Sequence, residues 1–189
     1  MGKGSGGTKK ADKTHNHLNG KESPVLFHGD SDEWYDWDKK EAKEYIDTVT
    51  NYQVNSDEVV EALAAFVDSD QHEIRQALRG NGNRYYLAKA RAIEEFIEVA
   101  PNYQGTTYRG IGMSEDEFSK LKVGIAYGRK GSTSWTTKAD VARYFDHNPD
   151  GNEVKVVLRC QKQRAVSIRF IAKYTDEHEV IASGYNKYK

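Results

Sequence analysis

Three short stretches of the chain carry side chains that could do chemistry together. In "YRG" (108–110) an arginine stands at the expected end of a strand, next to a glycine that allows close backbone approach. In "GSTSW" (131–135) three hydroxyl side chains follow a glycine. In "EHE" (177–179) two carboxylates stand two residues apart and point the same way if the segment is extended. Taken singly, each has an ordinary explanation: an ion pair, a helix cap, and two like charges screened by solvent.

The order of the three stretches is that of a known enzyme family. The chain resembles the arginine-serine-glutamate class of ADP-ribosyltransferases, which includes clostridial binary toxins, phage transferases and vertebrate arginine-specific ecto-enzymes. That class carries an aromatic-Arg-Gly, a Ser-Thr-Ser and a Glu-x-Glu or Gln-x-Glu, which here are "TYRGIG", "GSTSW" and "DEHEVIA". Upstream, "ALAAFVDSDQHEIRQALRG" resembles the helical segment that precedes the family's core. The resemblance therefore covers about residues 40–183.

The resemblance implies that the protein takes NAD as its substrate and requires no metal. The bond from nicotinamide to ribose breaks through an oxocarbenium-like state, which a carboxylate beside the ribose stabilises. Glu179 matches the catalytic glutamate, and Ser132 matches the serine that orients it. Arg109 matches the arginine that binds the NAD phosphates, for which a planar guanidinium is well suited. The other NAD-binding residues that the resemblance implies are Gly110, Thr133, Ser134 and Phe145.

Glu177 is the residue that the resemblance connects with the acceptor. Glutamate at this position accompanies transfer to arginine, because a carboxylate can bind a guanidinium in bidentate fashion and help it lose a proton. Tyr174, three residues earlier, is expected on the loop that meets the target protein. The poly-ADP-ribosyl polymerase branch has histidine where this chain has Arg109. We therefore expect a protein mono-ADP-ribosyltransferase of the arginine-specific type, as in toxins and phage or bacterial effectors.

Other functions stay open at this point. An NAD glycohydrolase, or a transferase whose acceptor is a nucleic-acid end, would use the same residues on another acceptor. A non-catalytic virion or binding module would keep the fold without turnover. The presence of Arg109, Ser132, Glu177 and Glu179 together argues against the last alternative.

Composition sets further bounds on the chain. Its 189 residues with a net charge of −1 suit one domain and give no reason to expect a membrane or nucleic-acid partner. The single cysteine, Cys160, excludes an intrachain disulfide framework. The longest apolar run, Ala62 to Val67, is far too short to span a bilayer. We expect the protein to act in the cytoplasm, either of the producing cell or of a target cell after delivery.

The elements that must position these residues can be read from the pattern of the chain. Residues 1–23 are expected to be a disordered tail or linker, and residues 24–189 a single domain. Its helical half covers about 38–100, and capping-box spacing predicts helix starts at Asp38, Asn55 and Asp70.

After Pro101 the period changes from helical to alternating, which begins a β-rich half at about 101–189. Strands are expected in "GTTYRGIG", "EVKVVLRC", "AVSIRFIA" and "EHEVIAS", and two short helices interrupt them, one capped by Ser114 and one over 138–145. Helices first and strands second predict an α+β fold. The resemblance makes this an N-terminal helical segment packed on a small mixed β-sandwich of the ADP-ribosyltransferase type.

Overall fold

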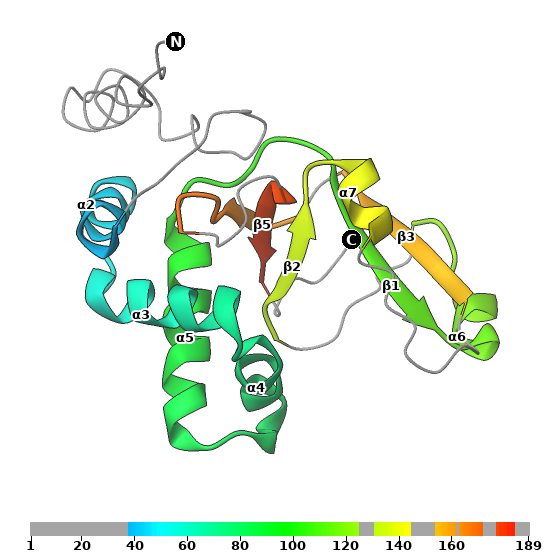
Figure 1. Ribbon diagram of the computed structural model, residues 1–189, viewed down its shortest axis with the longest axis horizontal. Helices are drawn as coiled ribbons and strands as arrows, with labels where there is room; N and C mark the ends of the chain where they lie inside the picture. The colour runs from blue at the N-terminus through cyan, green and yellow to red at the C-terminus, as the bar shows by residue number, and fades with distance from the viewer. Residues whose placement is uncertain (1–37, 125–130, 145–153, 162, 172–176, 184–189) are drawn as a thin grey trace, which may run out of the picture.

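The computed structural model describes residues 38–124, 131–144, 154–161, 163–171 and 177–183, and Figure 1 shows the arrangement of their elements. The helices are α2 (Lys39–Val49), α3 (Ser56–Asp68), α4 (Gln71–Gln76), the π-helical turn η2 (Ala77–Asn81), α5 (Arg84–Val99), α6 (Glu115–Lys120) and α7 (Ala139–Tyr144). The strands are β1 (Thr107–Met113), β2 (Thr133–Thr136), β3 (Val154–Cys160), β4 (Ala165–Ser167) and β5 (Glu179–Ala182). The expected α+β architecture is confirmed. The expected tail at 1–23, Phe145 and Tyr174 lie outside the described residues.

Side-chain caps explain where most of the helices begin. Asp38 and Glu41 form the predicted capping box, with the Asp38 side chain accepting from the Glu41 amide at 2.9 Å. Asn55 accepts from the amide of Glu58 at 3.3 Å, as its spacing predicts. The prediction of a capping box at Asp70 is wrong: its side chain accepts from the Ser69 hydroxyl at 2.9 Å, and α4 begins without a side-chain cap.

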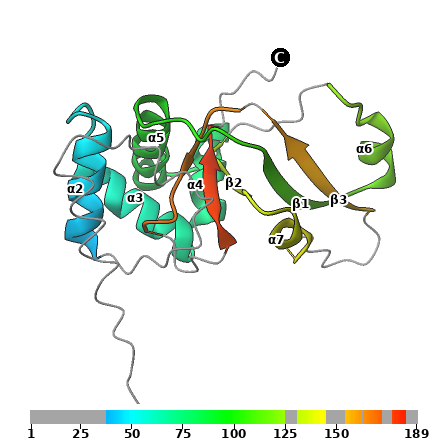
Figure 2. The ribbon, with the colours of Figure 1, turned by 90° about the horizontal axis from the view of Figure 1, so that it is seen from above.

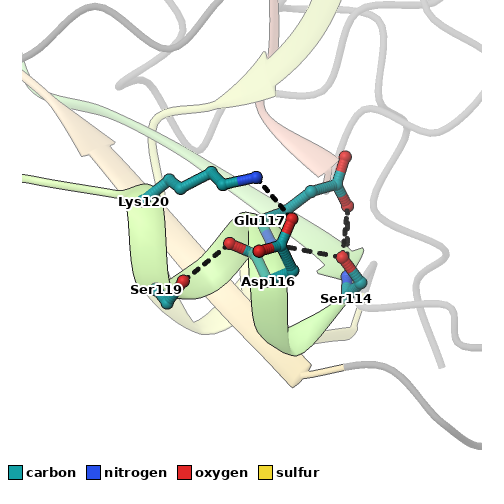
Figure 3. A network of polar contacts seen from close by, with 5 residues as sticks. All are labelled: Ser114, Asp116, Glu117, Ser119 and Lys120. Carbon is teal, nitrogen blue, oxygen red and sulfur yellow. Dashed lines mark hydrogen bonds and ion pairs between the residues drawn. The ribbon is translucent and has the colours of Figure 1, made fainter.

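The capping box predicted at Ser114 is confirmed and begins α6 (Figure 3). The Glu117 amide donates to Ser114 Oγ at 3.2 Å, and the Ser114 amide donates to Glu117 Oε2 at 3.1 Å. Lys120 forms an ion pair with Asp116 one turn earlier on the same helix. These local contacts hold the helix that follows β1.

The main core lies between the helical half and one end of the sheet. Ile46, Leu63 and Phe96 are fully buried there with Phe170, which follows β4. The Phe170 ring contacts that of Tyr45 at a centroid distance of 4.6 Å. Figure 2 shows α2, α3 and α5 at one end of the molecule and the β1–β3 pair with α6 at the other. The helical half is therefore fixed to the sheet by apolar burial near β4 and β5.

The described strands form one five-stranded sheet in the order β3-β1-β2-β5-β4, and each described pair is antiparallel. Together with the helical half, the described strands make up the expected α+β fold. Expected strand "AVSIRFIA" is shortened to β4, because the chain turns after it and the amide of Ile171 donates to Ile168 O at 3.0 Å. The three strands with the chemical motifs, β1, β2 and β5, are neighbours at the centre of the sheet. Among the described helices, all are too short or too polar to cross a bilayer.

Candidate active site

A cleft of about 480 Å³ opens where β1, β2 and the start of β5 meet the helical half. The described residues that line it are Val67, Gln71, Arg75, Tyr108, Arg109, Gly110, Ser134, Trp135, Thr136, Ala142, Glu177 and Glu179. Arg109, Gly110, Ser134, Glu177 and Glu179 were all expected from the sequence as site residues, and the fold brings them together. Ser132 and Thr133 are described but do not line the cleft.

Glu179 is the first residue of β5 and its side chain is almost fully enclosed, with 7% of the residue exposed. Burial raises the pKa of its carboxyl from 4.5 to about 7, and this is the largest influence on it. The hydrogen bond from Ser134 lowers that pKa, the negative charge of Glu177 raises it, and the positive charge of Arg75 lowers it. Glu179 is therefore a carboxylate whose charge changes near neutral pH.

The serine that contacts Glu179 is Ser134, which corrects the expectation for Ser132. Ser134 Oγ donates to Glu179 Oε1, whereas Ser132 Oγ donates to Glu94 Oε1 on α5 at 2.7 Å. The register of the strands is the reason. Thr136 pairs with Glu179 and Thr133 with Ala182, so residue 132 lies at the opposite end of the ladder from Glu179. The sequence motif identified the hydroxyl cluster, but the antiparallel register determines that its third residue, Ser134, is the one that contacts Glu179.

The two carboxylates of "EHE" line the same cleft, but not because the segment is extended. His178 between them has a φ of 48°, in the left-handed region, and Glu177 lies in a 3₁₀ turn before β5. Thr136 holds this turn, because its Oγ1 donates to the carbonyl of Glu177 at 2.7 Å. The amide of Thr137 donates to the carbonyl of His178 at 3.2 Å. The end of β2 thus fixes the turn that brings both acids to the cleft.

The helical half contributes Arg75, for which no role was expected from the sequence. Its Nε donates to the carbonyl of Gln71 at 3.3 Å, and its terminal nitrogen donates to the Gln71 side chain. Burial lowers the pKa of Arg75, and the charge of Glu179 opposes that change. In the sequence, the contact between Gln71 and Arg75 is indicated by their spacing alone, because residues four apart lie on one face of a helix.

Gly131 explains how α4 can lie so close to the sheet. It has a φ of 108°, and a Cβ added there would lie 2.7 Å from the carbonyl oxygen of Arg75. Only glycine fits this conformation without a shift of either backbone. Glycine at this position therefore allows α4, and with it Arg75, to lie close to the segment that precedes β2.

The remaining predicted site residues are divided between the cleft and its surroundings. Arg109 is half-buried in the middle of β1, where it pairs with Leu158 of β3. Thr133 Oγ1 accepts from Trp135 Nε1 at 3.0 Å, and this contact orients the indole, which lines the cleft. No role was expected for Trp135. The cleft thus combines two carboxylates, two guanidinium groups and the aromatic side chains of Tyr108 and Trp135.

This arrangement suits an anionic ligand with a reacting centre that becomes positive. The guanidinium groups can bind phosphate oxygens, and the buried carboxylate can stabilise a cation in an environment of low dielectric constant. The aromatic rings can pack against a planar heterocycle.

No family model matches the sequence, and no curated protein sequence matches it. Solved structures do match. The Vis toxin, an ADP-ribosyltransferase from Vibrio splendidus, superposes with a TM-score of 0.59 at 21% identity, over 77% of this chain and 72% of the toxin. A second Vis structure, in complex with agmatine, gives a TM-score of 0.58 at 19% identity, over 79% and 76% of the two chains.

Two proteins of the genus Pseudomonas have the same fold. The ADP-ribosyltransferase HopU1 of Pseudomonas syringae matches with a TM-score of 0.52 at 14% identity, over 92% of this chain and 87% of its own. Exoenzyme S from Pseudomonas aeruginosa, bound to carba-NAD and a human 14-3-3 protein, matches with a TM-score of 0.50 at 14% identity, over 76% and 69% of the two chains. This chain therefore has the fold of the mono-ADP-ribosyltransferases.

Proposed function

We propose that the protein transfers ADP-ribose from NAD to an arginine side chain of a protein and releases nicotinamide. The observation that supports this most directly is the buried Glu179, which Ser134 holds by a hydrogen bond in a cleft shared with Glu177 and Arg109. The fold similarity supports the same reaction class, because the Vis toxin and HopU1 are both described as ADP-ribosyltransferases.

In this proposal the arginines bind the dinucleotide. Arg109 and Arg75 line the cleft from β1 and α4, and their guanidinium groups suit the two charges of a pyrophosphate. Gly110 is buried in β1 beside Arg109, and without a Cβ its backbone can lie close to the ligand. Exoenzyme S, which shares the fold, is bound to an NAD analogue in its structure.

Glu179 then acts on the reacting ribose. In its ionised form it stabilises the positive charge that develops at ribose C1 as the bond to the nicotinamide nitrogen breaks. The electron pair of that bond leaves with nicotinamide, which becomes neutral. Ser134 keeps one carboxylate oxygen of Glu179 in place, so the other is available for a ribose hydroxyl.

Glu177 receives the acceptor. Its carboxylate lines the cleft beside Glu179, where it can bind a guanidinium through two hydrogen bonds and accept its proton as a guanidinium nitrogen bonds to ribose C1. The Vis toxin, which shares the fold, binds agmatine, a small molecule that ends in a guanidinium group. This similarity supports arginine over other acceptors.

The test is incubation with NAD labelled in its adenylate part, with agmatine or a cell lysate as acceptor. Wild type should label the acceptor, and Glu179→Gln should abolish both transfer and NAD hydrolysis. Glu177→Gln should lose transfer but keep hydrolysis, because only the acceptor contact is removed. Glu44→Gln, an exposed glutamate on α2, is the matched control and should behave as wild type. Transfer by Glu179→Gln at the wild-type rate would disprove the mechanism, and release of free ADP-ribose alone would identify a glycohydrolase.

A further inference from the structure

A carboxylate on α5 joins the ends of the two strands that carry the Ser134–Glu179 pair. Glu94 Oε1 accepts from Ser132 Oγ at 2.7 Å, and Glu94 Oε2 accepts from Ser183 Oγ at 2.5 Å. Ser132 immediately precedes β2, and Ser183 immediately follows β5. Each oxygen of one carboxylate therefore holds a different strand.

The bridge lies at the end of the ladder farthest from the reacting groups. Thr133 and Ala182 are paired at that end, and Thr136 and Glu179 are paired at the other. Ser134 is two residues from Ser132, which corresponds to about 7 Å along an antiparallel strand. Glu94 is not among the described residues that line the cleft. Glu94 can therefore act on the chemistry in two ways, through the positions of β2 and β5 or through its charge.

The contact between Ser134 and Glu179 depends on how β2 and β5 are aligned. Four residue pairs join these strands, and each strand is only four residues long. With only four residue pairs, few hydrogen bonds of the ladder hold the two strands together, so contacts at the ends of the strands add to their alignment. A rigid support is needed here because small displacements of a reacting carboxylate cost a large part of the rate.

We propose that Glu94 is a positioning residue: by accepting from both Ser132 and Ser183, it fixes β2 against β5 so that Ser134 holds Glu179 in its reactive orientation. This inference rests on the proposed function, because that function makes Glu179 the reacting carboxylate. It gives Ser132 a role in support of the strand, in place of the direct contact with Glu179 expected from the sequence.

The first test needs no turnover. Carbon-13 NMR titration gives the pKa of the Glu179 carboxyl in wild type, Glu94→Ala and Glu94→Gln. Glu94→Ala should raise that pKa, because the hydrogen bond from Ser134, which lowers it, is weakened. Loss of the Glu94 charge alone would have the opposite sign, since a nearby negative charge raises the pKa of a carboxyl. The other charged groups that line the cleft with Glu179, namely Arg75, Arg109 and Glu177, are the same in each variant.

Glu94→Gln separates the bridge from the charge. Its amide can accept from one serine and donate to the other, so the bridge persists without a negative charge. This variant should therefore show no rise in the pKa of Glu179. Glu98→Ala is the matched control, because Glu98 is exposed and lies one turn further along the same helix. It should leave the pKa unchanged.

The second test is steady-state turnover of NAD. Glu94→Ala should lower kcat by roughly tenfold with KM for NAD unchanged, whereas Glu94→Gln and Glu98→Ala should stay within about threefold of wild type. If Glu94→Ala does not fold, Ser183→Ala removes one arm of the bridge and should raise the pKa of Glu179 by a smaller amount. A pKa of Glu179 that is the same in Glu94→Ala and Glu98→Ala overturns the inference. Absence of turnover in wild type would instead refute the proposed function, and the titration would still decide the role of Glu94.

Discussion

Ser134 and Glu179 contact each other diagonally across the β2–β5 ladder. Ser134 pairs with Ile181 in the register, two residues beyond Glu179, and its hydroxyl reaches back along the sheet to Glu179 Oε1. Such diagonal neighbours are within reach of polar side chains in antiparallel sheets. Because the carboxylate is buried, this hydrogen bond determines the direction in which its second oxygen points.

Ser134 should therefore matter more for catalysis than Ser132. Ser134→Ala is expected to lower kcat by roughly 10- to 100-fold, because it removes a hydrogen bond to a buried charged group and loosens the reacting carboxylate. Ser132→Ala should lose less than about tenfold, since it removes only one arm of a support at the far end of the strand. The measurement is kcat for NAD hydrolysis with both variants at the same pH. A larger loss of kcat in Ser132→Ala than in Ser134→Ala would show that Ser132 orients the Glu179 carboxylate.

The raised pKa of Glu179 predicts how the activity depends on pH. The carboxylate must be ionised to stabilise a cation, and its pKa in the folded protein is about 7. The value of kcat/KM should therefore rise about tenfold per pH unit well below 7 and level off above it. The measurement is kcat/KM for NAD from pH 5 to 9. An acid limb at the ordinary glutamate pKa would show that another conformation of Glu179 is the active one.

The same pKa predicts a loss of stability as the pH rises from about 4.5 to about 7. Since the folded-state pKa of Glu179 is raised above its ordinary value of 4.5, the fold favours the protonated form. Its contribution to stability is fully present below pH 4.5 and is lost as the pH rises through about 7, by about 3 kcal/mol in total. Glu179→Gln should remove this loss. Its gain in unfolding free energy over wild type, measured by urea denaturation, should grow between pH 5 and 8, whereas that of Glu44→Gln should stay constant.

Arg75 should act on both NAD binding and the titration of Glu179. Arg75→Ala removes a cation from the cleft, so KM for NAD should rise by roughly tenfold, and the acid limb of the pH profile should move to higher pH. Arg75→Lys should restore the position of the acid limb but recover KM only in part, because an ammonium lacks the planar fork of a guanidinium.

The control for this prediction is Arg84→Ala. Arg84 is exposed at the start of α5 and does not line the cleft, so neither KM nor the pH profile should change. An unchanged acid limb in Arg75→Ala would show that its charge does not reach Glu179 in solution.

The sequence predicted the parts of the fold that depend on local chemistry. Helix starts at Asp38, Asn55 and Ser114 follow from the spacing of capping side chains, which acts within one turn. The motif residues Arg109, Glu177 and Glu179 were found because their types and order are those of a known family. The helix start predicted at Asp70 is also correct, since α4 begins at Gln71, but its side-chain cap is absent. The backbone of Asp70, with φ −93° and ψ 12°, is not in the extended conformation of a capping residue, and its carboxylate accepts from Ser69 instead.

The parts that could not be predicted depend on long-range pairing. The register of β2 against β5 decides that Ser134, and not Ser132, contacts Glu179, and strand composition alone does not fix a register. The left-handed conformation of His178 lies between the two acids, and this conformation is uncommon for any residue other than glycine, so the residue type does not predict it. Arg75 enters the cleft because the backbone of α4 lies against Gly131, just before β2, which is a tertiary contact.

Gly131 provides a test of that tertiary contact. Gly131→Ala should destabilise the protein in two ways: its φ of 108° is unfavourable for alanine, and the new Cβ would lie 2.7 Å from the carbonyl oxygen of Arg75. Gly80→Ala isolates the first effect, because Gly80 has a φ of 88° and an added Cβ would meet nothing within 4 Å. We expect a loss of about 1–2 kcal/mol for Gly80→Ala and about 1–3 kcal/mol more for Gly131→Ala, measured by urea denaturation. Gly131→Ala should also raise KM for NAD, since α4 must move and take Arg75 with it, whereas Gly80→Ala should not. Equal losses of stability in the two variants would show that α4 does not lie against the start of β2.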